Sequence, residues 1–223
     1  MRMNKNFIWL VIFFFALSAG FTSCAEDTEV TDPYANWQER NEHYIDSIAR
    51  VARNAPEGEK WEIYKNYKLD LSSSEGDLID RNEFYEYDSV YVKVIKEGDG
   101  IIPLYTDTVS VAYQGFLING SRFDGNYYGT FDPEVNDNYT SMVTGSESVI
   151  TGWTTALLYM KQGTFAEVYI PYQMAYGTGG SGSTIPGYSA LKFEIYLNEV
   201  IHPTGPDDRS RTSEDSEDSM KVE

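Results

Sequence analysis

Apolar and polar residues alternate in several stretches of the second half of the chain. Successive side chains of a strand point to opposite faces, so each such stretch predicts a strand with one buried face. One-sided burial is typical of antiparallel sheets, because parallel strands covered on both faces read as continuous apolar runs. Asn119-Gly120, between two apolar stretches, adds a hairpin signal. The apolar positions that alternate are Val90, Val92 and Val94; Val109, Val111 and Tyr113; Ala166, Val168 and Ile170; and Leu191, Phe193, Ile195 and Leu197.

Two stretches have the three- and four-residue spacing of a helix instead. The first runs from Tyr34 to Arg53, and Asp32-Pro33 supplies an N-cap followed by proline at the first helical position. The second is short, from Gly152 to Gln162, with Gly163 suited to the C-cap. One short helix covering a curved antiparallel sheet is an α+β fold, here with an N-terminal helical extension.

The first residues have the layout of an export signal, with positive charges, an apolar run from Phe7 to Ala19 and then small residues. A bilayer-spanning helix needs about 20 apolar residues, so we expect this segment to be removed. Phe21-Thr22-Ser23-Cys24 resembles a bacterial lipobox, which implies cleavage before Cys24 and a membrane anchor through its acylated thiol. The alternative is an ordinary secretory signal cut between Ala16 and Gly20, which leaves a free thiol.

The mature chain then divides by composition. We expect a signal peptide over 1–23, a tether, helix and partly extended connector over 24–87, the main domain over 88–202 and a disordered acidic tail over 203–223. The expected location is the outer membrane or periplasm of a Gram-negative bacterium, and acidic residues after Cys24 resemble surface-export tags, which favours exposure at the surface.

Charge and composition exclude several function classes. A net charge of -18 makes nucleic acid an improbable partner. With two histidines and one cysteine, neither a zinc site nor a Cys-His nucleophile pair is expected. Residues 177–182 match the pattern G-x-G-x-x-G, but Ile185-Pro186 follows where a nucleotide-binding helix has to begin. We therefore expect no cofactor and no metal, and a monomer.

Seven short strings, in one order over about residues 88–202, resemble the FKBP-type peptidyl-prolyl cis-trans isomerase family. The strings are Val111-Ala112-Tyr113-Gln114-Gly115, Gly120-Ser121-Arg122-Phe123-Asp124, Val149-Ile150-Thr151-Gly152-Trp153, Met160-Lys161-Gln162-Gly163, Ala175-Tyr176-Gly177, Ile185-Pro186 and Leu191-Lys192-Phe193-Glu194-Ile195.

The resemblance implies a sheet half-wrapped around the short helix and a pocket for the prolyl ring of polypeptide substrates. Trp153 forms its floor in the family pattern, and Asp124 is its one charged residue. The Ile150 N–H and the Tyr176 hydroxyl each bond a substrate carbonyl, while Asp124 interacts with Tyr113 and the twisting carbonyl. The implied catalytic residues are Tyr113, Phe123, Asp124, Trp153, Tyr176 and Phe193, with Val149, Ile150 and Ile185 as substrate-binding residues.

One stretch departs from the family pattern. Gly125 to Ser141 is much longer than the family's loop and can narrow the mouth of the cleft. Thr140 aligns with a position where the family has an aromatic wall residue, and the neighbouring Tyr139 is a candidate to supply that aromatic ring instead. The leading hypothesis is an isomerase that assists the folding of exported proteins. The alternatives are a non-catalytic peptide-binding or chaperone-like lipoprotein, and a surface structural or glycan-contacting lipoprotein suggested by 18 tyrosines.

Overall fold

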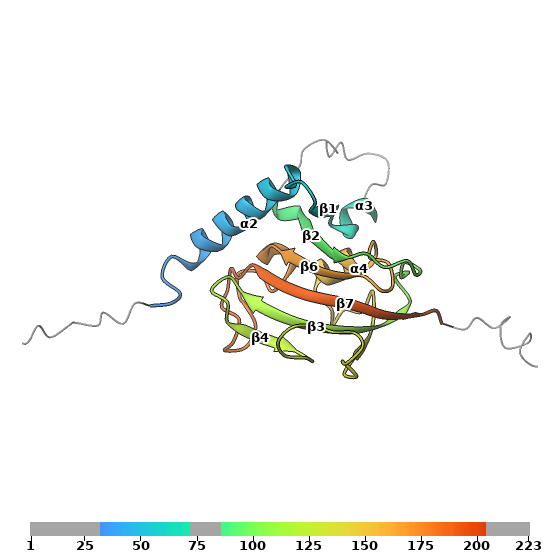
Figure 1. The fold of residues 1–223 in the computed structure, drawn as a ribbon. Coiled ribbons are helices and arrows are strands. Elements are labelled where there is room, and N and C mark those ends of the chain that lie inside the picture. Colours follow the sequence, from blue (N-terminus) through green and yellow to red (C-terminus); the bar gives the residue numbers. More distant parts are fainter. Residues whose placement is uncertain (1–31, 72–85, 204–223) are drawn as a thin grey trace, which may run out of the picture. The chain divides into compact units, whose positions relative to one another are not determined.

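The computed structural model describes residues 32–71 and 86–203 (Figure 1). The predictions for the signal peptide, Cys24 and the acidic tail fall outside these residues, apart from the tail's first position. The helices are α2 (Trp37–Arg53), α3 (Tyr67–Leu71) and α4 (Thr151–Leu157), with short 3-10 turns η1 (Glu86–Asp88) and η2 (Tyr172–Met174). The strands are β1 (Lys60–Lys65), β2 (Ser89–Lys96), β3 (Thr108–Leu117), β4 (Arg122–Gly125), β5 (Thr140–Val143), β6 (Phe165–Ile170) and β7 (Leu191–Ile201).

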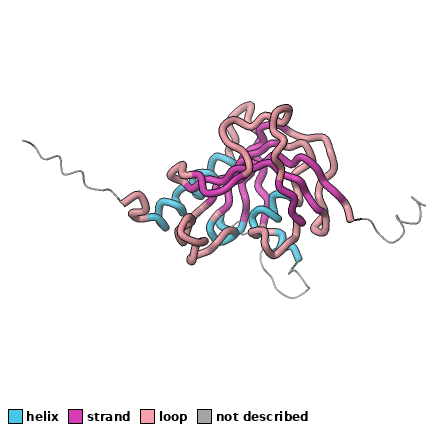
Figure 2. The backbone as a smooth tube through the Cα atoms, turned by 90° about the horizontal axis from the view of Figure 1, so that it is seen from below, coloured by secondary structure: helices cyan, strands magenta, loops and turns pink. Residues whose placement is uncertain are grey.

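The strands form one 7-stranded sheet in the order β1-β2-β6-β7-β3-β4, and β5 also pairs with β3. Every strand pairing in this sheet is antiparallel, which confirms the predicted α+β class. Figure 2 shows the strands gathered in one curved layer. The strand β1 was not predicted, because it lies at the edge of the sheet and its residues are partly exposed without a clean alternation.

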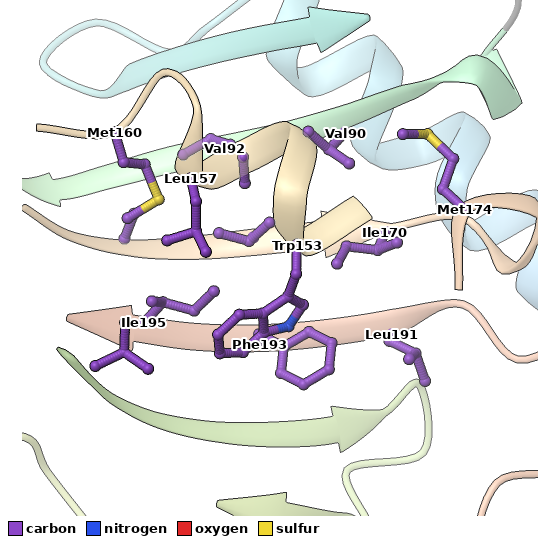
Figure 3. Packing of buried hydrophobic residues seen from close by; sticks show 14 of the residues in the cluster. Val90, Val92, Trp153, Leu157, Met160, Ile170, Met174, Leu191, Phe193 and Ile195 are labelled. Carbon is purple, nitrogen blue, oxygen red and sulfur yellow. The ribbon is translucent and has the colours of Figure 1, made fainter. Parts of the chain in front are cut away.

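The short helix α4 packs against the inner face of this sheet. Gly152 permits the close approach, since a Cβ there would lie 2.3 Å from Cγ2 of Ile170 on β6. Figure 3 shows Trp153 and Leu157 of the helix pointing toward the apolar residues of β6 and β7. The helix is shorter than predicted and ends at Leu157. Gly163 is not its cap, because its N–H donates to the carbonyl of Leu197 at 2.7 Å and starts the connection into β6.

The helix α2 covers the opposite face of the sheet. Its buried residues Ile45, Ala49 and Ala52 belong to one apolar cluster with Tyr91 of β2 and Tyr169 of β6. These tyrosines alternate with the inner-face residues of the same strands. The apolar stripe predicted for this helix therefore has the sheet as its partner.

The start of α2 differs from the prediction. The helix begins at Trp37, and its N-cap is Asn36, which has a φ of 52°. Asp32 caps a turn instead: its Oδ1 accepts the N–H of Tyr34 at 2.9 Å and its carbonyl accepts the N–H of Ala35 at 3.1 Å. The side chain of an aspartate before proline can satisfy turn and helix N–H groups equally well, so sequence alone does not separate the two outcomes. Within residues 32–71 and 86–203, no helix is long and apolar enough to cross a membrane.

Half-buried tyrosines make the fold sensitive to alkaline pH. Burial, with a smaller contribution from Glu167, raises the pKa of Tyr44 to about 12, and burial raises the pKa of Tyr64 to about 12 as well. The pKa of an unfolded tyrosine is about 10, which is lower than in the folded protein. Neutral phenol side chains therefore stabilise the folded state relative to the unfolded one. This stabilisation is complete below about pH 10 and is lost as the pH rises to about 12.

We expect the free energy of unfolding to fall over this interval by on the order of 1 kcal/mol for each of these tyrosines, once solvent screening is allowed for. Urea unfolding at about pH 9, 10.5 and 12 measures the change. Tyr44→Phe should lose less stability than the unmodified protein between the last two points. An equal loss in both proteins would remove Tyr44 from the explanation.

Candidate active site

A hollow with a cavity volume of about 110 Å³ opens on the inner side of the sheet. Its walls come from strands β3, β4, β5 and β7, from helix α4 and the segment before it, and from the residues after η2. All the pocket residues implied by the resemblance line it except Ile185. Ile185 is buried in the apolar cluster that also contains Trp153 and Phe193. The lining residues are Tyr113, Phe123, Asp124, Met142, Ser148, Val149, Ile150, Trp153, Tyr176 and Phe193.

Trp153 forms the floor of the hollow. It lies in the first turn of α4 and is only 4% exposed. The rings of Tyr113 and Phe193 meet it edge to face, with centroids at 5.1 Å and 5.2 Å. Figure 3 shows the indole and the Phe193 ring side by side between the helix and β7. Edge-to-face contacts place the positive ring edge on a negative ring face, so the three rings hold one another in a fixed arrangement.

One wall depends on a glycine. The rings of Phe123 and Phe193 meet edge to face with centroids at 5.5 Å, and they close over Gly115 of β3. A Cβ on Gly115 would lie 2.7 Å from the nearest atom of each ring. Glycine is therefore required at position 115 for a steric reason, because any side chain there would displace the two rings.

The polar side of the hollow is a tyrosine–aspartate pair. The hydroxyl of Tyr113 donates to Oδ2 of Asp124 at 3.0 Å, and the N–H of Gly125 donates to Oδ1 at 2.7 Å. Burial, together with the negative charge of Asp124, raises the pKa of Tyr113 to about 12, and burial also raises the pKa of Tyr176. Both hydroxyls therefore stay protonated near neutral pH and can donate hydrogen bonds.

The main chain of Ile150 contributes a further donor. Ile150 is the N-cap of α4 in an extended conformation, and its carbonyl accepts the N–H of Trp153 at 3.0 Å. Among the residues that the structure describes, none accepts a hydrogen bond from the Ile150 N–H. Ile150 lines the hollow, so this N–H is a candidate donor to a carbonyl group of a bound peptide.

Two lining residues, Met142 and Ser148, were missed from the sequence. Thr140 and Met142 occupy alternate positions of β5 and so share a face. The two-residue period would have indicated Met142 as a wall residue when Thr140 was considered. Neither Thr140 nor Tyr139, the predicted substitute, lines the hollow.

The long loop after β4 does not reach the hollow. No residue of 126–141 is among those that line it. Instead, the ring of Phe131 packs on Tyr196 of β7 at 4.8 Å and on Phe165 of β6 at 5.3 Å. Tyr196 and Phe165 alternate with inner-face residues, so the loop lies against the other face of the sheet. The predicted narrowing of the cleft mouth is therefore not seen.

The glycine-rich segment 177–182 forms tight turns and no helix follows it within the described residues. Ser181 and Ile185 form an isolated antiparallel bridge, and Gly180 has a φ of 71° with the carbonyl of Ile185 close to where a Cβ would lie. The segment thus lacks the turn-to-helix geometry of a dinucleotide site. In the described part of the chain, no three His, Cys, Asp or Glu side chains are grouped as a metal ion would require.

A curved antiparallel sheet around one short helix, with an aromatic hollow between them, defines an α+β protein with a pocket for a small apolar group. Residues 102–198 match the family described as FKBP-type peptidyl-prolyl cis-trans isomerase, so this segment of the chain is a domain of that type.

Similar proteins carry names of this family. The chain is 39% identical over 109 residues to the FKBP-type 22 kDa peptidyl-prolyl cis-trans isomerase of Escherichia coli, covering 49% of this chain and 48% of the relative. It is 37% identical over 108 residues to the outer membrane protein MIP of Legionella longbeachae, covering 48% and 42%. The chain thus spans about half the length of the curated relatives it matches.

A solved structure shows the same fold. The peptidyl-prolyl cis-trans isomerase from Pseudomonas syringae pv. tomato superimposes with a TM-score of 0.51 at 24% identity, covering 77% of this chain and 98% of that one. The likeness supports the arrangement of the elements.

Proposed function

We propose that the chain is a peptidyl-prolyl cis-trans isomerase and that the hollow binds the prolyl ring. The observation that carries this proposal is the convergence of aromatic side chains from separate elements on one hollow that has a single carboxylate in its wall. These side chains are Tyr113, Phe123, Trp153, Tyr176 and Phe193. The family match supports the same reaction.

The reaction needs rotation about a bond with partial double-bond character. The barrier of a peptide bond is about 18–20 kcal/mol, and each reduction by about 1.4 kcal/mol raises the rate tenfold. A dry aromatic site disfavours the charge-separated resonance form that gives the bond its double-bond character, so transfer from water into the hollow lowers the barrier. Only contacts that are stronger to the twisted amide than to the planar one add to the rate.

The donors of the site suit this requirement. In the proposed complex the Ile150 N–H and the Tyr176 hydroxyl each hold a peptide carbonyl on either side of the prolyl ring. The carbonyl before proline turns toward Tyr113 and Asp124. The side chains of this pair interact with the carbonyl as it leaves the amide plane. No proton is transferred and no cofactor takes part in this mechanism.

The isomerisation rate of a short Xaa-Pro peptide tests the proposal. We expect the purified protein to accelerate it, and Tyr113→Phe and Asp124→Asn each to lower kcat/KM about tenfold. Tyr113→Phe removes the 3.0 Å hydrogen bond and Asp124→Asn removes the charge of its acceptor, so the double variant should lose less than the product of the two losses. Tyr87→Phe is the matched control. The Tyr87 hydroxyl donates to Asp46 at a distance of 3.1 Å, and neither residue lines the hollow.

An unmodified protein that binds the peptide without accelerating its isomerisation would contradict catalysis. It would favour the alternative of a peptide-binding or chaperone-like protein.

The proposed setting is the cell envelope, with the protein anchored through lipidated Cys24 and assisting the folding of exported proteins. The signal-like layout of residues 1–23 supports export, as does the name of the Legionella relative, outer membrane protein MIP. Mass spectrometry of the mature N-terminus tests the anchor. Diacylated or triacylated Cys24 as the first residue is expected, and a free amino group at any other residue would overturn it.

A further inference from the structure

The strand β3 changes partners beside the hollow. Its residues 108–111 pair with β5 and its residues 114–116 pair with β4. The last pair on one side is Val111 with Thr140, and the first on the other is Gln114 with Gly125. The backbone of Tyr113 lies between them, at a point on this edge where neither strand supplies the regular ladder.

Asn126 fills this gap. Its side-chain Oδ1 accepts the N–H of Tyr113 at 2.8 Å, and its own N–H donates to the carbonyl of Tyr113 at 3.0 Å. Its Nδ2 donates to the carbonyl of Val111 at 2.9 Å and to Oγ1 of Thr140 at 3.0 Å. One residue thus replaces the missing ladder bonds of β3 and ties that strand to β5. Buried main-chain groups without a partner are costly, so this arrangement fixes the backbone at Tyr113.

Asn126 is also linked to the other end of the same tyrosine. Asp124, which accepts the Tyr113 hydroxyl, lies two residues before it, and Gly125 between them has a φ of 137°. A Cβ on Gly125 would lie 2.6 Å from the Tyr113 carbonyl. The sequence Asp124-Gly125-Asn126 therefore folds tightly around Tyr113, with the carboxylate at its hydroxyl and the amide at its backbone.

We propose that Asn126 is a positioning residue of the active site: its side-chain amide holds the backbone of Tyr113 so that the tyrosine hydroxyl meets Asp124 at the wall of the hollow. Asn126 does not line the hollow, and it acts on the peptide only through Tyr113. This inference rests on the proposed isomerase function for its effect on rate, but not for its effect on Tyr113.

The test compares Asn126→Ala and Asn126→Asp with a matched control. Asn41→Ala removes another amide that satisfies main-chain groups: Asn41 donates to the carbonyl of Trp37 at 2.7 Å and accepts the N–H of Ala190 at 2.8 Å, between α2 and the start of β7. Both alanine variants should lose stability to a similar extent in urea unfolding. The variant Asn126→Asp keeps the size and the acceptor for Tyr113, but it places an oxygen against the carbonyl of Val111.

Two readouts separate positioning from stability. We expect Asn126→Ala to lower kcat about tenfold with KM changed less than about twofold, Asn126→Asp to give a smaller loss, and Asn41→Ala to keep the kcat of the unmodified protein. Tyrosine-labelled NMR titration should show the pKa of Tyr113, about 12 in the intact site, moving toward its ordinary value in Asn126→Ala and not in Asn41→Ala.

The outcomes are distinguishable from a failure of the isomerase proposal. If the unmodified protein does not accelerate isomerisation, the proposed function fails, while the titration of Tyr113 still decides the role of Asn126. An unchanged Tyr113 titration in Asn126→Ala would overturn the inference. The same shift in Asn41→Ala would also overturn it, because the change would then reflect general loosening of the fold.

Discussion

Trp153→Ala is expected to lower kcat/KM for an Xaa-Pro peptide by about 100-fold or more. The substitution removes the floor of the hollow together with the faces on which Tyr113 and Phe193 rest. Water then reaches the site, and the desolvation on which the proposed rate enhancement depends is lost. A 100-fold loss corresponds to about 2.7 kcal/mol of transition-state stabilisation.

The same substitution should cost about 3–5 kcal/mol of folding stability, as is typical when a buried tryptophan is truncated. Denaturant unfolding must therefore accompany the assay, and Trp153→Phe provides a milder variant that keeps an aromatic floor. Trp61→Ala is the matched control, because Trp61 on β1 stacks on Tyr169 at the other face of the sheet. If a folded Trp153→Ala protein keeps full activity, the indole is not the floor of the working site.

Gly115→Val is expected to be the second most damaging substitution at the site. The added methyl groups occupy the space of the Phe123 and Phe193 rings, which a Cβ alone would approach to 2.7 Å. Overpacking of this kind typically costs about 1–3 kcal/mol. The displaced rings also enter the hollow, so we expect kcat/KM to fall at least about tenfold, with Gly115→Ala less affected than Gly115→Val.

A compensating substitution tests the steric reason. Phe123→Leu shortens one of the two rings that a Cβ on Gly115 would approach, so Gly115→Ala combined with Phe123→Leu should be less destabilised than the sum of the two single variants in urea unfolding. Strict additivity would show that the glycine and the ring do not compete for the same space.

The sequence was most informative where a pattern depends on local geometry. Two-residue alternation predicted the strands that carry Val111, Val168 and Ile195, because the inner face of an antiparallel sheet is the one that is buried. The ordered strings also contain the residues that line the hollow except Met142 and Ser148. Their roles in binding and catalysis are still predictions.

Features set by tertiary contacts were not visible in the sequence. The edge strand β1 has no clean alternation because neither of its faces is fully covered. In the sequence, Asn126 is one of several asparagines in a loop. Its role becomes visible only in the structure, where β3 passes from pairing with β5 to pairing with β4 and the Asn126 amide bonds the β3 backbone. The position of the long loop also depends on a distant contact, the packing of Phe131 on Tyr196.

The central claim is that the hollow over Trp153 takes up a prolyl ring, and fluorine NMR of the protein labelled with 5-fluorotryptophan tests it most directly. The chain has four tryptophans, of which Trp37 and Trp61 do not line the hollow and serve as internal references. We expect an Xaa-Pro peptide to shift the Trp153 resonance to saturation while Trp37 and Trp61 stay unchanged, and the matching Xaa-Ala peptide to shift none of them. If the Trp153 resonance does not respond to the proline peptide, or responds equally to the alanine peptide, the hollow is not a site for the prolyl ring.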